Sequence, residues 1–159
     1  MAEVDENVCE HLGSADTLVM PVDFVLDQES DSELIGQWGE LLVKNFLEKI
    51  QSQPDSDIVA IEWSNAVSQT GLPYDFIIRR RMVDGAETEV YVEVKSTLSD
   101  KKACFEISMQ QVMFAEENGA AYHIYRVYSA GNARQVRLAK VENLLAKLKC
   151  KQVRLLMVI

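Results

Sequence analysis

Apolar and polar residues alternate along two neighbouring stretches of the chain, and this alternation predicts a pair of β-strands. The first stretch, 71–78, is Gly-Leu-Pro-Tyr-Asp-Phe-Ile-Ile, and the second, 89–97, is Glu-Val-Tyr-Val-Glu-Val-Lys-Ser-Thr. Both stretches are rich in β-branched and aromatic residues and are bounded by turn formers. We therefore expect a β-hairpin whose turn is the segment 82–85, Met-Val-Asp-Gly.

Hydrophobic spacing elsewhere predicts helices and further strands. In the segment 34–51, apolar residues recur at three- and four-residue steps, which is typical of a helix with one buried face. Ser108 and Gln111 fit a capping box that begins a second helix, and Gly119 is the expected residue just past its end. A third helix is expected over 141–149, and strands over 58–63, 103–107, 121–128, 134–139 and 152–159. This order predicts an α/β fold with a mixed central sheet flanked by helices.

The first helix carries two glycines. Ser30 and Glu33 form a Ser-x-x-Glu capping box ahead of it. Gly36 and Gly39, inside the helix, cost about 1 kcal/mol each relative to alanine. We expect the compensation to be a close approach of the helix to the sheet or to a ligand. Glu40 lies one turn beyond Gly36, beside the apolar stripe.

Charge divides the chain into a leader and a domain. The net charge is −9, from 25 acidic and 16 basic residues. Residues 1–33 contain ten of the acids and no lysine or arginine, so residues 34–159 are close to neutral. We expect 1–33 to be an acidic, flexible, solvated leader and 34–159 to be the folded domain. An alternative is that the leader competes with DNA for a basic groove.

Side-chain alternation also brings reactive groups together. Along the second strand of the hairpin, Tyr91, Glu93 and Lys95 share one face and the valines at 90, 92 and 94 share the other. Asp75, at the start of the preceding strand, is expected opposite this pair. An Asp on one strand with Glu-x-Lys on the next can hold a divalent metal and orient a water. Alternatively, Glu93 and Lys95 form a surface ion pair worth about 0–1 kcal/mol, and Asp75 only caps a turn.

The motifs resemble those of a known family. Pro73-Tyr74-Asp75 with Glu93-Val94-Lys95 resembles the core motif of the PD-(D/E)XK nucleases. Over roughly residues 34–130, the wider pattern is similar to the C-terminal domain of the plant NO VEIN protein and its relatives. The blocks that carry this resemblance are Gly36-Gln37-Trp38-Gly39-Glu40, Trp63-Ser64-Asn65, Gly71-Leu72-Pro73-Tyr74-Asp75, Val92-Glu93-Val94-Lys95-Ser96-Thr97, Phe105-Glu106-Ile107-Ser108 and the strand Tyr122–Val127.

The resemblance implies a restriction-endonuclease-like core and a metal-dependent endonuclease that hydrolyses phosphodiester bonds, of DNA rather than RNA. On the matching positions, Asp75, Glu93, Glu40 and the backbone carbonyl of Val94 would supply oxygen ligands to Mg²⁺ or Mn²⁺. Lys95 would orient the attacking water or stabilise the charge of the transition state. Glu40 would bind a second ion or hold a water.

Further residues are candidates for contact with the substrate. Gln111 already has a capping role, so Gln110 is freer to face the site, where related nucleases often carry a helical Gln or Glu. Two roles are open for charged residues at a strand end or in a polar loop: they contact phosphates, or they are only solvated surface charges. The residues expected to bind nucleic acid are Arg79, Arg81, Ser96, Lys101 and Lys102.

A second hypothesis is a nuclease-like module without catalysis that binds nucleic acid or protein, or acts as a scaffold. The near-neutral domain favours it, because tight DNA binding usually uses several phosphate contacts. The apolar end at 155–159, Leu-Leu-Met-Val-Ile, is expected to pair with the sheet or to bind a protein partner or a second copy.

The sequence also bears on the compartment. No apolar run approaches the ~20 residues of a membrane span, and no basic segment precedes the short apolar stretch at 18–26, so we expect neither a membrane partner nor a signal peptide. Cys9, Cys104 and Cys150 lack metal-ligand spacing and are expected to be reduced thiols of an intracellular protein. A DNA substrate favours the nucleus over the cytoplasm in a eukaryotic cell.

Overall fold

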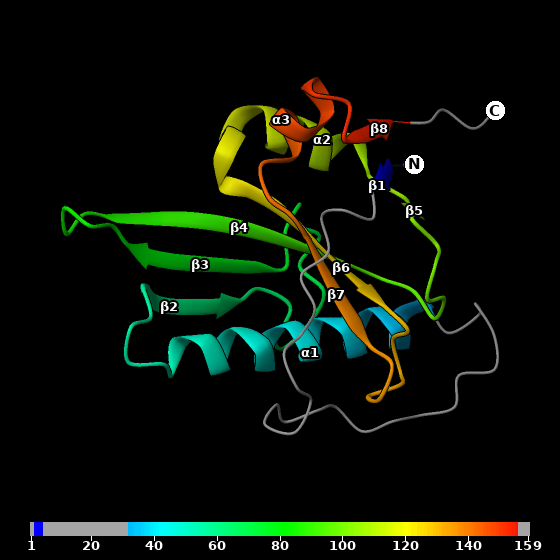
Figure 1. Ribbon diagram of the computed structural model, residues 1–159, viewed down its shortest axis with the longest axis horizontal. Coiled ribbons are helices and arrows are strands. Elements are labelled where there is room, and N and C mark those ends of the chain that lie inside the picture. Colours follow the sequence, from blue (N-terminus) through cyan, green and yellow to red (C-terminus); the bar gives the residue numbers. More distant parts are fainter. Residues whose placement is uncertain (1, 5–31, 156–159) are drawn as a thin grey trace.

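The computed structural model describes residues 2–4 and 32–155, and a five-stranded mixed sheet forms its centre (Figure 1). In spatial order the strands are β2 (Ile58–Trp63), β3 (Phe76–Arg81), β4 (Glu87–Ser96), β6 (Tyr122–Tyr128) and β7 (Arg137–Val141). Neighbouring strands are antiparallel except β4 and β6, which are parallel. The predicted α/β class and the predicted hairpin, now β3 and β4, are therefore confirmed.

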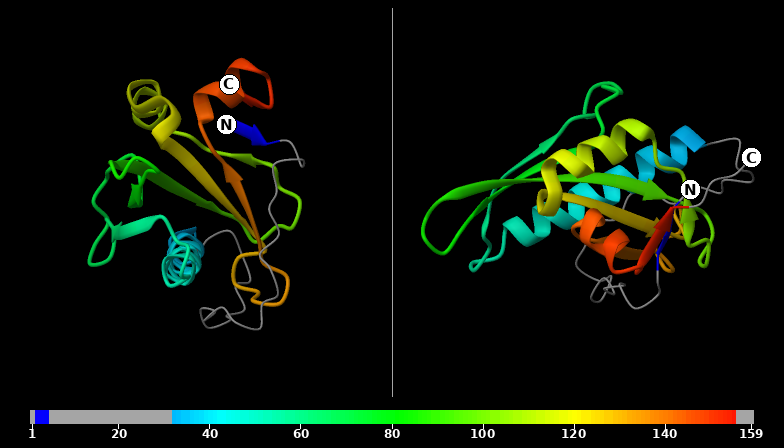
Figure 2. Two further views of the ribbon diagram at one scale, coloured as in Figure 1. Left: turned by 60° about the vertical axis from the view of Figure 1, so that its left-hand side comes forward. Right: turned by 90° about the horizontal axis from the view of Figure 1, so that it is seen from above.

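Helix α1 (Ser32–Gln51) covers one face of the sheet (Figure 2). It begins two residues before the predicted start, and the first two residues of the predicted capping box lie outside the described residues. The buried side of α1 packs against the valine face of β4. A Cβ atom at Gly39 would collide with the Ser96 side chain, whereas one at Gly36 would meet nothing within 4 Å. The expected close approach is thus confirmed for Gly39 alone.

The other face of the sheet is covered by α2 (Met109–Asn118) and α3 (Leu144–Lys149), as Figure 2 shows. A one-turn 3-10 helix, η4 (Gly119–Ala121), joins α2 to β6. The predicted capping box at the start of α2 is present, with both hydrogen bonds between Ser108 and Gln111. Phe105, Tyr122, Ile124 and Leu144 belong to the core on this side. No helix within the described residues has the length and apolar character that a membrane span needs.

Two predicted boundaries near the C-terminus are wrong. The strand expected over 134–139 is β7, which begins at Arg137, because turn hydrogen bonds from residues 135 and 136 to the Asn132 carbonyl occupy the preceding segment. The helix expected from Val141 begins at Leu144. Val141 still belongs to β7, and Asn143 caps the helix by accepting a hydrogen bond from the Ala146 amide.

A small second sheet has the order β5-β1-β8. Its strands are β5 (Cys104–Phe105), β1 (Ala2–Val4) and β8 (Val153–Leu155), and β1 pairs antiparallel with both neighbours. Strand β1 was not predicted. The rest of the predicted leader up to residue 31 lies outside the described residues, as do the last four residues of the predicted C-terminal strand. Residues 153–155 pair with β1 in this second sheet and not with the central sheet, and of the apolar end 155–159 only Leu155 is described.

Candidate functional site

Asp75 immediately precedes β3 and contacts β4 twice. Its amide donates a hydrogen bond to the Val92 carbonyl at 2.8 Å, and its carboxylate Oδ2 accepts one from the Val94 amide at 2.7 Å. Asp75 therefore holds β4 on both sides of Glu93, which brings the two carboxylates together. The Tyr122 hydroxyl donates to the Pro73 carbonyl at 2.8 Å and so fixes the loop before Asp75.

Glu93 and Lys95 lie on the same face of β4, as predicted, and form a direct ion pair. Lys95 Nζ lies 2.9 Å from Glu93 Oε1. The same oxygen accepts a hydrogen bond from Gln111 Nε2 at 2.7 Å, while Gln111 Oε1 accepts from the Ser108 amide at 3.0 Å. Gln111 thus caps α2 and orients Glu93 at the same time. Only 7% of Glu93 is exposed, so this pair is not the surface ion pair of the alternative hypothesis.

Asn65 connects the carboxylate on α1 with the one beside β3. Its Nδ2 donates to Asp75 Oδ1 at 2.7 Å and to Glu40 Oε2 at 3.3 Å. Trp63 Nε1 donates to the same Glu40 oxygen at 2.8 Å. The side-chain oxygen of Asn65, Oδ1, accepts hydrogen bonds from the Thr70 amide at 3.1 Å and the Thr70 hydroxyl at 3.0 Å, and these fix the orientation of the side chain.

The three acids form a buried cluster with surplus negative charge. Asp75 is 8% exposed, and Glu40 and Glu93 are 7% exposed. Burial raises the pKa of Asp75 from 3.8 to about 8; the charges of Glu93 and Glu40 add to the increase, and the Val94 amide and Lys95 oppose it. Burial also raises the pKa of Glu93, against the opposing effect of Lys95. Such a cluster favours the binding of a proton or of a cation.

The donor set fits a metal ion only in part. Within residues 2–4 and 32–155, no three His, Cys, Asp or Glu side chains are grouped so that they could hold one ion. The predicted set of three carboxylates is therefore not assembled, because one oxygen of Glu40 accepts from both Trp63 and Asn65. Asp75 and Glu93, with the Val94 carbonyl, remain as candidate oxygen donors. Mg²⁺ is commonly held by one or two carboxylates and keeps several waters, so these residues fit it.

The structure corrects one predicted contact, that of Gln110, and places the hydroxyl of a second candidate, Ser96, against α1. Gln110 is exposed, and it is Gln111 that reaches Glu93, because the inward face of α2 begins at residue 111. The Ser96 hydroxyl is buried without a hydrogen-bond partner and lies where α1 passes closest, at Gly39. Its hydroxyl therefore faces α1, and the expected contact of Ser96 with nucleic acid stays a prediction.

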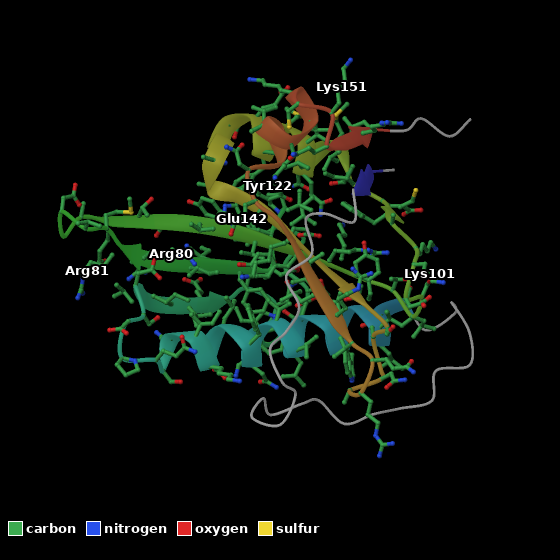
Figure 3. The ribbon with its side chains drawn as sticks, in the orientation of Figure 1. Arg80, Arg81, Lys101, Tyr122, Glu142 and Lys151 are labelled. Carbon is green, nitrogen blue, oxygen red and sulfur yellow. The ribbon has the colours of Figure 1, made fainter. Side chains whose placement is uncertain are left out.

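The basic residues expected to bind nucleic acid do not form one surface. Figure 3 shows Arg80 and Arg81 on the hairpin arm at one end of the molecule and Lys101 at the opposite end. Arg79 and Arg81 pair with acids of β4, at 3.8 Å to Glu89 and 3.6 Å to Glu87. Lys101 and Lys102 follow β4 in an exposed loop. Only the lysine pair lies beyond the end of β4 at which Lys95 is found.

Asn65, Gln111 and Tyr122 complete the site without having been predicted as part of it. Asn65 stood in a Trp-Ser-Asn block with no assigned role, and its partner Thr70 is a loop residue. The predicted capping box gave Gln111 a structural role, so its second contact, with Glu93, was not predicted. Burial raises the pKa of Tyr122, and the charges of Glu93 and Asp75 raise it further.

Comparisons with known proteins agree on one family. The family described as "Protein NO VEIN, C-terminal" matches residues 39–139, which is more than half of the chain and includes every residue of the site described above. Two relatives from Arabidopsis thaliana match over 67 residues: Protein NO VEIN at 43% identity and Protein NO VEIN-LIKE at 46%. The match covers 42% of this chain but only 2% and 10% of those relatives, so the chain spans a small part of their length. The chain belongs to the NO VEIN C-terminal family.

Proposed function

We propose that this chain is a metal-dependent endonuclease of the PD-(D/E)XK type that hydrolyses phosphodiester bonds of DNA. The observation that supports this most is the convergence of Asp75, Glu93 and Lys95. These residues come from the two motifs that resemble the PD-(D/E)XK core. Glu93 pairs with Lys95, and the Asp75 carboxylate, which is buried like that of Glu93, binds the amide of Val94 between them. A DNA substrate leads us to propose the nucleus as its location in a eukaryotic cell.

Asp75, Glu93 and the Val94 carbonyl would hold Mg²⁺ or Mn²⁺. When bound, the metal would neutralise charge on the phosphate and lower the pKa of a water that it binds. The raised pKa of Asp75, about 8, means that its carboxyl carries a proton at neutral pH. That proton must leave before the carboxylate can act as a ligand, so metal binding would release a proton.

Side chains of the protein would position the two carboxylates and compensate negative charge. Lys95 is the cation beside Glu93, and its side chain is 20% exposed against 9% for that of Glu93, so the ammonium lies closer to solvent and to an incoming phosphate. It would stabilise the negative charge that develops in the transition state. Asn65 and Gln111 are positioning residues, because each donates to one of the two carboxylates.

Cleavage of supercoiled plasmid DNA with Mg²⁺ or Mn²⁺ tests the proposal, with RNA as a parallel substrate. We expect nicking that is lost in Asp75→Asn, Glu93→Gln and Lys95→Ala. Glu89→Gln is the matched control, because Glu89 lies on the same strand but is exposed. Nicking that persists in both Asp75→Asn and Lys95→Ala would come from a contaminant, and it would defeat the proposal.

The runner-up function is an inactive nuclease-like module that binds nucleic acid or protein. The observation that favours it is the lack of a three-ligand group within the described residues. Each oxygen of Asp75 also already accepts a hydrogen bond. Calorimetric titration with Mn²⁺ separates the two: binding that is lost in Asp75→Asn supports the nuclease, and no Mn²⁺ binding supports the inactive module.

A further inference from the structure

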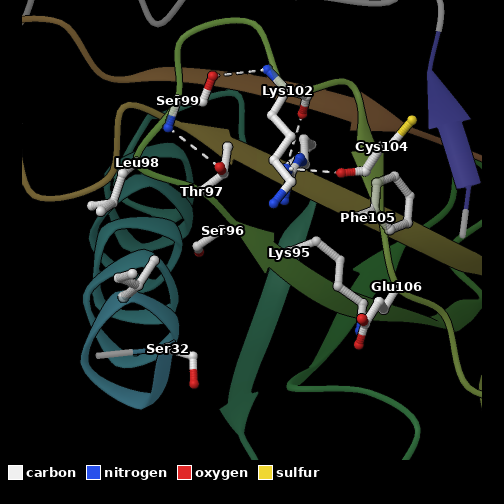
Figure 4. A pocket seen from close by; sticks show the side chains of 12 residues that line it. Ser32, Lys95, Ser96, Thr97, Leu98, Ser99, Lys102, Cys104, Phe105 and Glu106 are labelled. Carbon is white, nitrogen blue, oxygen red and sulfur yellow. Dashed lines mark hydrogen bonds between the residues drawn. The ribbon is translucent and has the colours of Figure 1, made fainter. Parts of the chain in front are cut away.

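A cavity of about 550 Å³ adjoins Lys95 at the end of β4 (Figure 4). It lies between the first turn of α1, the segment that follows β4, and β5, and its lining includes Arg126 of β6. Neither Asp75 nor Glu93 lines it, so it is a space separate from the acid cluster. Lys95 belongs to both, because it lines the cavity and pairs with Glu93.

Arg126 is a buried cation that no acid balances. It is 2% exposed, and its Nη2 donates to the carbonyls of Lys102 at 3.0 Å and Cys104 at 3.5 Å. Its Nε has no hydrogen-bond partner, and among residues 2–4 and 32–155 no carboxylate pairs with its guanidinium. A buried charge without a counter-charge is costly, so an anion in the adjoining cavity would offset that cost.

Other groups around the cavity also favour an anion. Lys95 is the direct neighbour of Arg126 across the β4/β6 pairing, and Lys102 lines the cavity from the loop. Figure 4 shows both lysine side chains and Ser32 around the same space. Ser32 is the first residue of α1, where the helix dipole and unpaired amides attract negative charge. Among the described residues that line the cavity, Glu106, which is exposed, is the only acid.

We propose that this cavity binds a phosphate group of the DNA strand, next to the phosphodiester that is cleaved. The chemistry of the cavity indicates a phosphate, because an arginine N–H without a partner, lysine ammonium groups and a helix start all favour such an anion. The assignment to a DNA strand rests on the proposed nuclease function, and Lys95 would connect the two phosphates. The cavity falls within the range of about 300–1,000 Å³ that holds small ligands, so the sugar of a nucleotide also fits.

The first test uses inorganic phosphate, with EDTA present so that no metal contributes. Amide chemical shifts measured by NMR during the titration report both affinity and fold. We expect Lys102→Gln to weaken binding about tenfold or more, because it removes one charge-assisted contact with the anion. Arg126→Met should weaken it further. Lys101→Gln is the matched control, because Lys101 is exposed and adjacent but does not line the cavity.

The Lys102→Gln variant keeps the test decisive even if Arg126→Met does not fold, because Lys102 is exposed. Unchanged phosphate affinity in Lys102→Gln, or an equal loss in Lys101→Gln, would overturn the phosphate site. Inorganic phosphate and a phosphate of the DNA backbone share the same chemistry, so the DNA experiment decides which source of phosphate the cavity takes.

The second test measures binding of a fluorescent oligonucleotide in EDTA by the Asp75→Asn variant, which isolates DNA binding from cleavage. We expect inorganic phosphate to compete with the oligonucleotide. Lys102→Gln should lower the slope of log affinity against log salt by about 1. Phosphate that binds without competing would overturn the DNA assignment. Competition without any plasmid cleavage by the wild type would refute the nuclease and leave the cavity assignment standing.

Discussion

Asp75 makes the stability of this protein depend on pH in an unusual direction. Its pKa is raised from 3.8 to about 8 by burial and by the charges of Glu93 and Glu40. The folded protein therefore holds the Asp75 proton more tightly than the unfolded chain does. The stabilisation is complete below about pH 4 and is lost as the pH rises through 8. Replacing Asp75 with asparagine, which does not titrate, should remove this dependence.

The size of this effect on the free energy of unfolding follows from the raised pKa of Asp75. Between the two pKa values of Asp75 the folded state carries about one proton more than the unfolded chain, so the free energy of unfolding falls by about 1.4 kcal/mol per pH unit. From about pH 5 to pH 7 the loss is about 3 kcal/mol. The asparagine side chain of the Asp75→Asn variant has a single acceptor for the two donors, Asn65 and Val94. The substitution therefore also costs about 1–3 kcal/mol, and this cost is the same at every pH.

Urea unfolding followed by tryptophan fluorescence measures the effect, because Trp38 is buried. Wild type and Asp75→Asn are compared at about pH 5, 6 and 7 in EDTA. The lowered pKa of the buried His123 acts in the opposite direction, since its stabilising effect grows as the pH rises, but both proteins contain it. The difference between the two proteins at each pH therefore reports the proton of Asp75 together with its interaction with Glu93. Parallel pH curves for wild type and Asp75→Asn would refute the reasoning.

Two further sets of substitutions test contacts of the fold. Gln111→Ala removes both a helix cap and a donor to a buried carboxylate, so the free energy of unfolding should fall by about 2–3 kcal/mol. Gln110→Ala, at an exposed position, should change it by less than about 0.5 kcal/mol; equal losses in urea unfolding would contradict the orientation of α2. Gly39→Ala should lower stability by about 1–3 kcal/mol through its clash with Ser96, and Ser96→Gly should restore most of it. Gly36→Ala, with nothing within 4 Å, should instead stabilise by up to about 1 kcal/mol; a gain in thermal stability for both alanine variants would show that Gly39 is not in close contact.

Local patterns predicted most of the fold because they depend on few residues. The alternation along β4 put Glu93 and Lys95 on one face, and the pairing with Arg126 and Tyr122 on β6 follows that same face. The capping box at Ser108 defined the start of α2 to the residue. Strand β1 could not be predicted in this way, because three residues carry no periodicity and its pairing partners are about 100 and 150 residues away in the chain.

The parts of the site that the sequence did not predict depend on contacts between distant segments. Asn65 acquires its role only when α1 and the start of β3 meet, because it donates to one carboxylate from each. Gln111 and Gln110 are equally polar in the sequence, and only the rotation of α2 against β4 distinguishes them. In the sequence, Arg126 is one polar residue of an alternating strand. Its burial arises only in the folded protein, where it contacts Cys104 and Phe105 of β5.

The electrostatics of the site argue that its charges serve a ligand and not the stability of the fold. Burial, together with the charges of Glu93 and Glu40, raises the pKa of Asp75 to about 8. On the strand next to β4, the buried Arg126 has no acid partner among the described residues. Pairing Arg126 with one of the three acids would relieve both costs, yet Glu93 pairs with Lys95, the neighbour of Arg126 on β4. A fold that keeps negative and positive charges apart in this way fits the proposed pair of adjacent sites, one for a cation and one for an anion. Metal ions and phosphates are ligands that would bind to such a pair of sites together, and each would remove a cost that the unliganded protein carries.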